Sequence, residues 1–170
     1  IYLHELAAGG AITVGTASAV TVDVNDVLRA NCNSTTTDVS QDRTLDSLED
    51  LTTTANNGVI KLVAEGGTIT VNAGTADTAG VSADGTGDVL LEARGTASDV
   101  VINADVTSVG GHITLNAADD VDVNDVLTTG GTGTVYLTAG DNDATGLNGI
   151  SLDAQITTVD GDVLLSSADD

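Results

Sequence analysis

The stretch GGHITLNAADDVDVNDVLTTGG, residues 110–131, holds the two phrases that decide the fold of this 170-residue chain. The first phrase is Gly, any residue, Ile or Val, any residue, Leu or Val, any residue, Ala. Its copies are GTITVNA at 67–73, GDVLLEA at 87–93, GHITLNA at 111–117 and GTVYLTA at 133–139, with a variant GDVLLSS at 161–167 and a degraded copy AITVGTA at 11–17. The successive spacings from Gly67 through Gly87, Gly111, Gly133 and Gly161 are 20, 24, 22 and 28 residues, which indicates an internal repeat.

A second phrase lies between the copies of the first. It reads DVVINADVTSVGG at 99–111, DVDVNDVLTTGG at 120–131 and GISLDAQITTVDG at 149–161, and VTVDVNDVL at 20–28 repeats its VDVNDVL core. Both phrases alternate apolar and polar residues with period two, which is typical of strands with one buried face. We therefore expect each coil to hold two short strands separated by turns of Gly, Asp, Asn and Thr.

The period and the alternation together predict an all-β parallel β-helix, or β-solenoid, with about 20–28 residues per coil. A leucine-rich repeat lacks support because its LxxLxL pattern is absent, and a propeller blade requires a period near 40. The residues expected to point inward are Ile69, Val71, Leu91, Ile113, Leu115, Val121, Val123, Val135, Leu137, Ile150, Leu152, Val163 and Leu165.

The apolar composition suits such a narrow interior. The chain has no Phe, Trp, Met or Pro, and its only aromatic residues are Tyr2 and Tyr136. A globular core usually draws much of its buried area from aromatic side chains. A core of Val, Ile, Leu and Ala fits stacked repeated layers better than an immunoglobulin-like sandwich.

One segment, 29–56, interrupts the pattern within what we otherwise predict to be a single solenoid over 1–170. It has no alternation, and Leu45, Leu48 and Leu51 follow at intervals of three. This spacing predicts an insertion with a short helix lying on the solenoid, the alternative being a loop. The chain begins at Ile1 and shows no signal peptide, and we expect it to be a fragment of a longer repeat array.

The charge limits the function classes. With 26 acidic and 4 basic residues the formal net charge is −22, which repels nucleic acid and anionic membrane surfaces. No apolar run reaches the length of a membrane span. Cys32 is the only cysteine, so the chain cannot form an internal disulfide.

Residues 110–131 together with 149–170 resemble the repeats of filamentous-haemagglutinin-type adhesins and of other giant bacterial surface proteins. The likeness covers 58–170 well and 10–28 weakly. It implies a right-handed parallel β-helix, export to the cell surface, and a role in adhesion or biofilm formation. The motif of this family carries no catalytic residues, so none is transferred to this chain.

We therefore expect a non-catalytic structural or adhesive segment of an extracellular bacterial surface protein or fibre. One alternative is a calcium-binding adhesion module, and a lesser one is a β-helical polysaccharide-active enzyme. Binding of an acidic polysaccharide needs basic side chains, and the chain has only Arg29, Arg43, Lys61 and Arg94. The two histidines, His4 and His112, stand apart from any Ser or Cys nucleophile context, so we expect no enzyme.

Calcium is the cofactor to consider because carboxylates cluster in the turns. The candidate ligands are Asp119, Asp120, Asp122, Asp125, Asp141 and Asp143. Calcium prefers six to eight oxygen ligands, which clustered Asp and Asn residues can supply. The EF-hand loop and the GGxGxDxUx repeat are both absent, and a solvated acidic surface explains the same residues.

Two further patterns concern the surface and the ends. Pairs of hydroxyl residues occupy equivalent sites in successive coils: Thr107-Ser108, Thr128-Thr129 and Thr157-Thr158. Hydrogen bonding and β-propensity explain these pairs, and ice binding is the less favoured interpretation. After GDVLLSSADD at 161–170 no further strand follows, so apolar residues such as Val163 and Leu165 are expected to be exposed. We expect self-association end to end, or continuation of the same chain, with a cell-surface or matrix ligand as a further partner.

Overall fold

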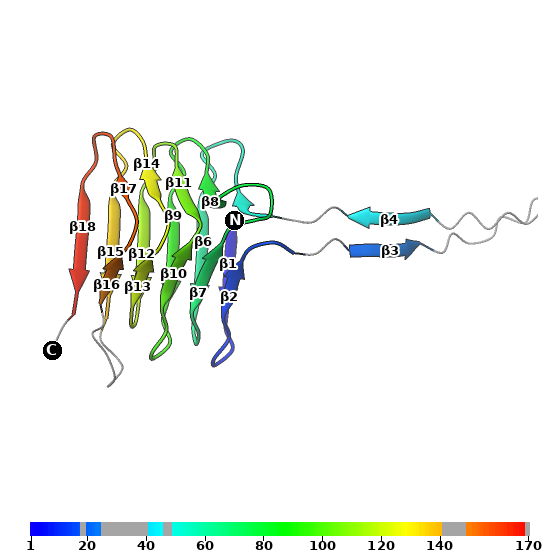
Figure 1. Cartoon of the computed structure of the whole chain (residues 1–170), viewed down its shortest axis with the longest axis horizontal. Coiled ribbons are helices and arrows are strands. Elements are labelled where there is room, and N and C mark those ends of the chain that lie inside the picture. The colour runs from blue at the N-terminus through cyan, green and yellow to red at the C-terminus, as the bar shows by residue number, and fades with distance from the viewer. Residues whose placement is uncertain (18–19, 25–40, 46–48, 141–148, 169–170) are drawn as a thin grey trace, which may run out of the picture. The chain divides into compact units, whose positions relative to one another are not determined.

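The computed structural model describes residues 1–17, 20–24, 41–45, 49–140 and 149–168. The chain divides into two compact units, one formed by Ile1–Gly15 with Glu49–Asp170 and the other by Thr16–Leu48. The first unit is a stack of coils made of short strands (Figure 1). The described residues form strands, turns and bends but no helix.

Three parallel sheets form the walls of this stack. The first sheet contains, in order, β1 (Tyr2–Glu5), β6 (Ile60–Ala64), β9 (Val89–Ala93), β12 (Ile113–Ala117), β15 (Val135–Ala139) and β18 (Val163–Ser167). The second contains β2 (Ile12–Val14), β7 (Ile69–Asn72), β10 (Val100–Asn103), β13 (Val121–Val123) and β16 (Ile150–Leu152). The third contains β5 (Leu51–Thr52), β8 (Ala79–Ala83), β11 (Asp105–Ser108), β14 (Leu127–Thr129) and β17 (Ile156–Thr157).

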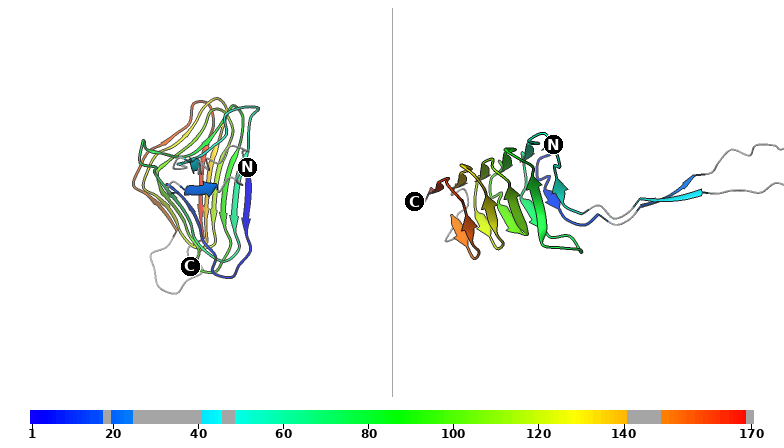
Figure 2. Two further views of the ribbon diagram at one scale, coloured as in Figure 1. Left: turned by 90° about the vertical axis from the view of Figure 1, so that its right-hand side faces the viewer. Right: turned by 90° about the horizontal axis from the view of Figure 1, so that it is seen from above.

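The chain passes through the first, second and third sheets in turn and then starts the next coil, so the predicted parallel β-solenoid is confirmed. Seen along the stack, successive coils superpose (Figure 2). Each complete coil has three strands where the sequence predicted two. The reason is that the second phrase bends at a corner: in DVVINADVTSVGG the corner is Ala104, and β10 and β11 on its two sides enter different sheets.

Register in the first sheet gives the coil lengths. Lys61, Leu90, Thr114, Tyr136 and Leu164 are successive partners, so the coils are 29, 24, 22 and 28 residues long. Tyr2 pairs with Lys61, which makes the first coil 59 residues long. The segment 16–48 accounts for 33 of these, and the remaining 26 lie within the range of the other coils.

Two copies of the first phrase belong to a different sheet from the one that their sequence suggested. GTITVNA at 67–73 contains β7, which pairs with β10 in the second sheet, and AITVGTA at 11–17 contains β2 of the same sheet. The other copies contain strands of the first sheet, where IKLVA at 60–64 supplies the missing member. The 20-residue spacing from Gly67 to Gly87 therefore separates strands of two different sheets. The sequence did not distinguish them, because strands of both sheets follow a glycine and have alternating apolar residues.

The interior consists of columns of like side chains, one from each coil. In the first sheet Leu62, Leu91, Leu115 and Leu137 are register partners, and each is 0% exposed. Nine of the thirteen residues predicted to point inward are fully buried: Ile69, Val71, Leu91, Ile113, Leu115, Val121, Val123, Val135 and Leu137. The other four lie in the last coil, where Ile150 is half-buried and Leu152, Val163 and Leu165 are exposed, since no described coil stacks on them.

The described strands of the unit 16–48 do not belong to a coil. These strands, β3 (Val20–Val24) and β4 (Gln41–Leu45), pair antiparallel, so VTVDV at 20–24 does not form a solenoid strand; the rest of the phrase 20–28 lies outside the described residues. The predicted insertion at 29–56 ends earlier than expected, since Leu51 begins β5 and pairs with Val81 of the solenoid. The predicted short helix is absent from the described part of this segment, where Leu45 ends a strand; residues 25–40 and 46–48, including Leu48, lie outside it.

A glycine begins each phrase of the first sheet because the backbones of successive coils approach closely there. A Cβ built on Gly111 would lie 2.3 Å from the carbonyl oxygen of Gly87, and one on Gly133 would lie 2.3 Å from that of Gly111. No real Cβ contact is so short, so the backbone would have to move. Only glycine lets successive coils approach at this corner.

We therefore predict that Gly111→Ala destabilises the solenoid by roughly 1–3 kcal/mol, the usual cost of overpacking. Thermal and urea unfolding followed by circular dichroism will measure the change. Gly110→Ala is the matched control, because its Cβ would meet the carbonyl oxygen of Gly85 at an ordinary 3.5 Å. Equal melting temperatures for the two variants would contradict the explanation.

Candidate functional site

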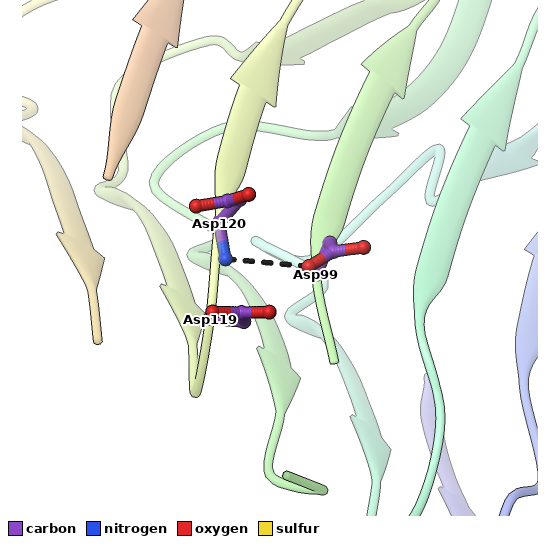
Figure 3. A group of neighbouring side chains, drawn as sticks. All are labelled: Asp99, Asp119 and Asp120. Carbon is purple, nitrogen blue, oxygen red and sulfur yellow. Dashed lines mark hydrogen bonds between the residues drawn. The ribbon is translucent and has the colours of Figure 1, made fainter. Parts of the chain in front are cut away.

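Three carboxylates come together where the chain enters the second sheet (Figure 3). Asp99 directly precedes β10, and Asp120, with Asp119 before it, directly precedes β13 in the next coil. One carboxylate oxygen of each lies within 4.8 Å of one oxygen of each of the others. Asp119 is 4% exposed, whereas Asp99 and Asp120 are half-buried. This acidic corner is the described site whose donor set best suits a hard cation.

The carboxylates at this corner also hold neighbouring coils together. The backbone N–H of Asp120 donates to Oδ1 of Asp99 at 3.3 Å, and that of Gly149 donates to Oδ1 of Asp120 at 2.7 Å. One coil earlier, the N–H of Asp99 donates to the hydroxyl oxygen of Thr68 at 3.2 Å. Each acceptor side chain thus receives the N–H of the equivalent residue in the next coil, and we call this series the second-sheet ladder.

The first sheet has a ladder of the same kind. The backbone N–H of His112 donates to Oδ1 of Asp88 at 2.8 Å, and that of Thr134 donates to Nδ1 of His112 at 3.0 Å. Nδ1 of His112 must be unprotonated to accept this bond. His112 is exposed, and the contact observed for its ring is structural.

A third ladder was missed from the sequence. The side-chain amide of Asn103 donates to Oδ1 of Asn72 at 3.1 Å, and that of Asn124 donates to Oδ1 of Asn103 at 2.9 Å. Each Asn follows the last buried residue of its second-sheet strand. The signal was present in VNA at 71–73, INA at 102–104 and VND at 123–125, once these are aligned by sheet and not by distance along the chain.

The four predicted calcium ligands that the structure describes do not gather in one place. Asp119 and Asp120 lie together in the acidic corner, with Asp99 as the member that the sequence missed. Asp122 lies on β13 between the buried Val121 and Val123, and Oδ1 of Asp125 accepts the N–H of Val126 at 2.8 Å in the turn before β14. Asp141 and Asp143 lie outside the described residues.

Since oxygens of Asp99 and Asp120 already accept backbone N–H groups, they are partly committed to the fold. We therefore expect calcium to bind weakly at most. Calcium binding stays a prediction, and calorimetry with calcium against magnesium at matched ionic strength is the measurement that checks it. Heat and stabilisation no greater than with magnesium would leave only a solvated acidic surface.

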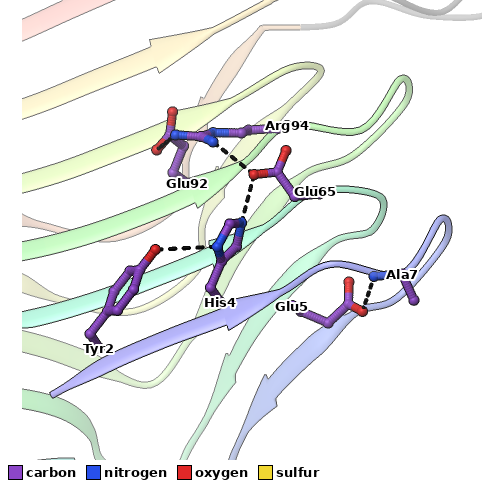
Figure 4. A network of polar contacts seen from close by, with 7 residues as sticks. All are labelled: Tyr2, His4, Glu5, Ala7, Glu65, Glu92 and Arg94. Atoms are coloured by element: carbon purple, nitrogen blue, oxygen red, sulfur yellow. Dashed lines mark hydrogen bonds and ion pairs between the residues drawn. The ribbon is translucent and has the colours of Figure 1, made fainter.

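A polar network occupies the outer face of the first sheet near β1 (Figure 4). Nε2 of His4 lies 2.6 Å from Oε1 of Glu65, and the guanidinium of Arg94 bridges Glu65 at 2.7 Å and Glu92 at 2.9 Å. The hydrogen bond from His4 is the largest influence on Glu65 and, with Arg94, holds the pKa of this carboxyl below its usual value. Exposed pairs of this kind add little stability.

The same network bears on substrate binding. Arg94 and Lys61 are the only Lys or Arg residues outside the unit 16–48. Arg94 is neutralised by two glutamates, and the ammonium of Lys61 lies 5.6 Å from the ring centre of Tyr2. These two side chains therefore form no basic groove for an acidic polysaccharide.

Neither a protein family nor a curated protein nor a solved structure matched this chain when it was compared with each. Among the described residues, no helix is long and apolar enough to cross a membrane.

The acidic corner predicts a pH effect at Asp122. Burial, followed by the negative charges of Asp120, Asp99 and Asp153, raises the pKa of the Asp122 carboxyl above its ordinary value. The folded state therefore binds this proton more tightly than the unfolded state, so stability falls as the pH rises through the pKa of the folded state.

We predict that Asp122→Asn raises the melting temperature at pH 7, by roughly 1–3 °C for a gain of up to about 1 kcal/mol. The gain should shrink as the pH falls through the raised pKa of Asp122 in the folded state, where the wild-type carboxyl also becomes protonated. Calorimetric melting of both proteins between pH 3 and 8 will measure it. Asp160→Asn, which removes one exposed charge elsewhere, is the control; an equal gain from it would attribute the effect to net charge alone.

Proposed function

We propose that this chain is a structural or adhesive segment of an extracellular bacterial surface protein or fibre, and that it carries no catalytic activity. The observation that supports this most is the repetition of the interior: successive coils place apolar side chains in the same columns, as Leu62, Leu91, Leu115 and Leu137 show. Such a stack can be lengthened coil by coil without redesign, because each coil contacts only its neighbours. A rod that sets a distance is the simplest use of this architecture.

The outer surface supports the same proposal. The outward positions carry ladders of short polar side chains, such as Asn72, Asn103 and Asn124, which are already bonded to one another. The first-sheet ladder likewise uses His112 as a hydrogen-bond acceptor. Side chains engaged in holding the coils are poorly placed to serve as acids, bases or nucleophiles. The resemblance to adhesin repeats is the further support for a place at the cell surface.

An antibody raised against residues 49–168 will test the location. We expect it to label intact cells of the source organism as strongly as permeabilised cells. Labelling that requires permeabilisation would overturn the surface assignment, and an antibody against a cytosolic protein of the same cells is the control for leakage. Release of reducing ends or unsaturated sugars from a panel of polysaccharides by the purified chain would overturn the non-catalytic part.

A further inference from the structure

The larger outward side chains of the solenoid gather on one wall, the outer face of the first sheet. On its strands or next to them lie both tyrosines, both histidines, and the lysine and arginine of the solenoid unit: Tyr2, His4, Lys61, Arg94, His112 and Tyr136. The described strands of the second and third sheets have only Thr, Ser, Asn, Asp, Val or Ala at their outward positions. Tyrosine and arginine are enriched where proteins contact partners, so the first sheet offers the outer face best suited to recognition.

Three neighbouring strands of this sheet form a patch around Tyr136. Its members are the outward register partners on β9, β12 and β15, and we call them the tyrosine face: Leu90, Glu92, Thr114, Asn116, Tyr136 and Thr138. Each of the three strands is paired on both sides, so the exposure of these residues is a property of the sheet face and not of an open coil. Tyr136 is 40% exposed, and the other five residues are half-buried.

The ring of Tyr136 is available to a ligand, whereas that of Tyr2 is engaged within the chain. The hydroxyl of Tyr2 lies 3.2 Å from Nδ1 of His4 (Figure 4). The ammonium of Lys61 also lies 5.6 Å from the ring centre of Tyr2. Among the described residues, Tyr136 has no hydrogen bond to its hydroxyl and no aromatic or cationic side chain on its ring. Its neighbour on β12 in the same column is Thr114, whose short side chain leaves the ring accessible.

The polar neighbours of Tyr136 are also available. Within the described part of the chain, the hydroxyls of Thr114 and Thr138 form no hydrogen bond, unlike the amides of the asparagine ladder on the second sheet. The side-chain amide of Asn116 donates to Oε1 of Glu92 at 3.4 Å, which leaves its own carbonyl oxygen to accept. An aromatic ring with a few hydrogen-bonding groups around it is the composition of a surface that binds small molecules.

These groups match the two kinds of surface that a sugar ring presents. A pyranose has a face of C–H groups, which packs on an aromatic ring, and an edge of hydroxyls, which exchange hydrogen bonds with hydroxyls and amides. The tyrosine face spans three strands about 4.8 Å apart. It is therefore far smaller than the roughly 800 Å² that each partner contributes to a stable protein interface, and a few sugar rings suffice to cover it.

The charge of the chain selects among sugars. Glu92 is the charged member of the tyrosine face, and the guanidinium of Arg94 next to it is shared between Glu92 and Glu65. With a net charge of −22 and no free basic side chain on the tyrosine face, the surface repels glycans that carry carboxylate or sulfate groups. Uncharged glycans experience no such repulsion.

We propose that the tyrosine face binds an uncharged glycan, with one sugar ring stacked on Tyr136 and the sugar hydroxyls bonded to Asn116 and the two threonines. This inference rests on the proposed adhesive role, which it deepens by naming the class of ligand and the place where it binds. The contact breaks and forms no covalent bond, in keeping with a chain that carries no catalytic activity.

Nuclear magnetic resonance tests the site directly, because the only aromatic side chains of this protein are two tyrosines and two histidines. Soluble oligomers of glucose, mannose, galactose and N-acetylglucosamine are titrated separately to millimolar concentration. At least one of them should shift the ring signals of Tyr136 and leave those of Tyr2 in place. An oligomer of galacturonic acid is the anionic control and should shift neither. Unmoved Tyr136 signals with all four neutral oligomers, or equal shifts with the anionic one, would overturn the proposal.

Substitutions of the two tyrosines test the role of the ring. Tyr136→Ala should weaken binding of the same oligomer about tenfold or more, because the stacking contact is lost. Tyr136→Phe keeps the ring and should retain most of the affinity. Tyr2→Ala is the matched control, since Tyr2 belongs to the same outward column and is also exposed, and it should bind as the wild type does. Equal losses from Tyr2→Ala and Tyr136→Ala would contradict the assigned site.

Two further measurements separate this proposal from others. Tyr136 signals that move with protein concentration in the absence of sugar would show that a second copy covers the tyrosine face, which would overturn the glycan assignment. Circular dichroism and thermal melting will verify that all variants are folded, as expected for substitutions of exposed side chains. Surface labelling of cells does not depend on sugar binding, so the proposed location and the proposed ligand can fail separately.

Discussion

Parallel pairing of each strand with the equivalent strand of the next coil is the constraint on which the rest of this structure depends. It places equivalent positions of successive coils next to one another, so a side chain that suits one coil also suits the next. The leucine side chains from Leu62 to Leu137 pack on one another and are buried. The glycines in the column through Gly111 have no Cβ, which lets the backbones of successive coils approach closely. A larger residue at that corner would push against the backbone of the preceding coil.

The same constraint explains part of the acidity. Strand pairing leaves backbone N–H groups at the corners, and buried or half-buried N–H groups need acceptors. Asp88, Asp99 and Asp120 supply carboxylate oxygens to the coil that follows each of them. Burial raises the pKa of the Asp122 carboxyl, and repulsion by the nearby carboxylates of Asp120, Asp99 and Asp153 raises it further. The acidic corner is therefore explained by the fold before any ligand is invoked.

Alternation with period two identified the buried face of each strand, which is why the solenoid and the inward positions of the middle coils could be predicted. This alternation could not show which sheet a strand joins. The phrases that contain β7 and β12, GTITVNA and GHITLNA, share one pattern, yet the two strands belong to different sheets. Asp99 was missed for the same reason: its distance from Asp120 along the chain equals one coil, and only the register places them together.

Leu115 and Leu165 show how far local sequence can determine burial in a solenoid. They occupy the same column, GHITLNA and GDVLLSS surround them with nearly the same pattern, and yet one is 0% and the other 49% exposed. The difference lies entirely in whether a coil covers them. Stability in such a stack comes from interfaces between neighbours, so each added coil converts an exposed face into a buried one and creates another like it.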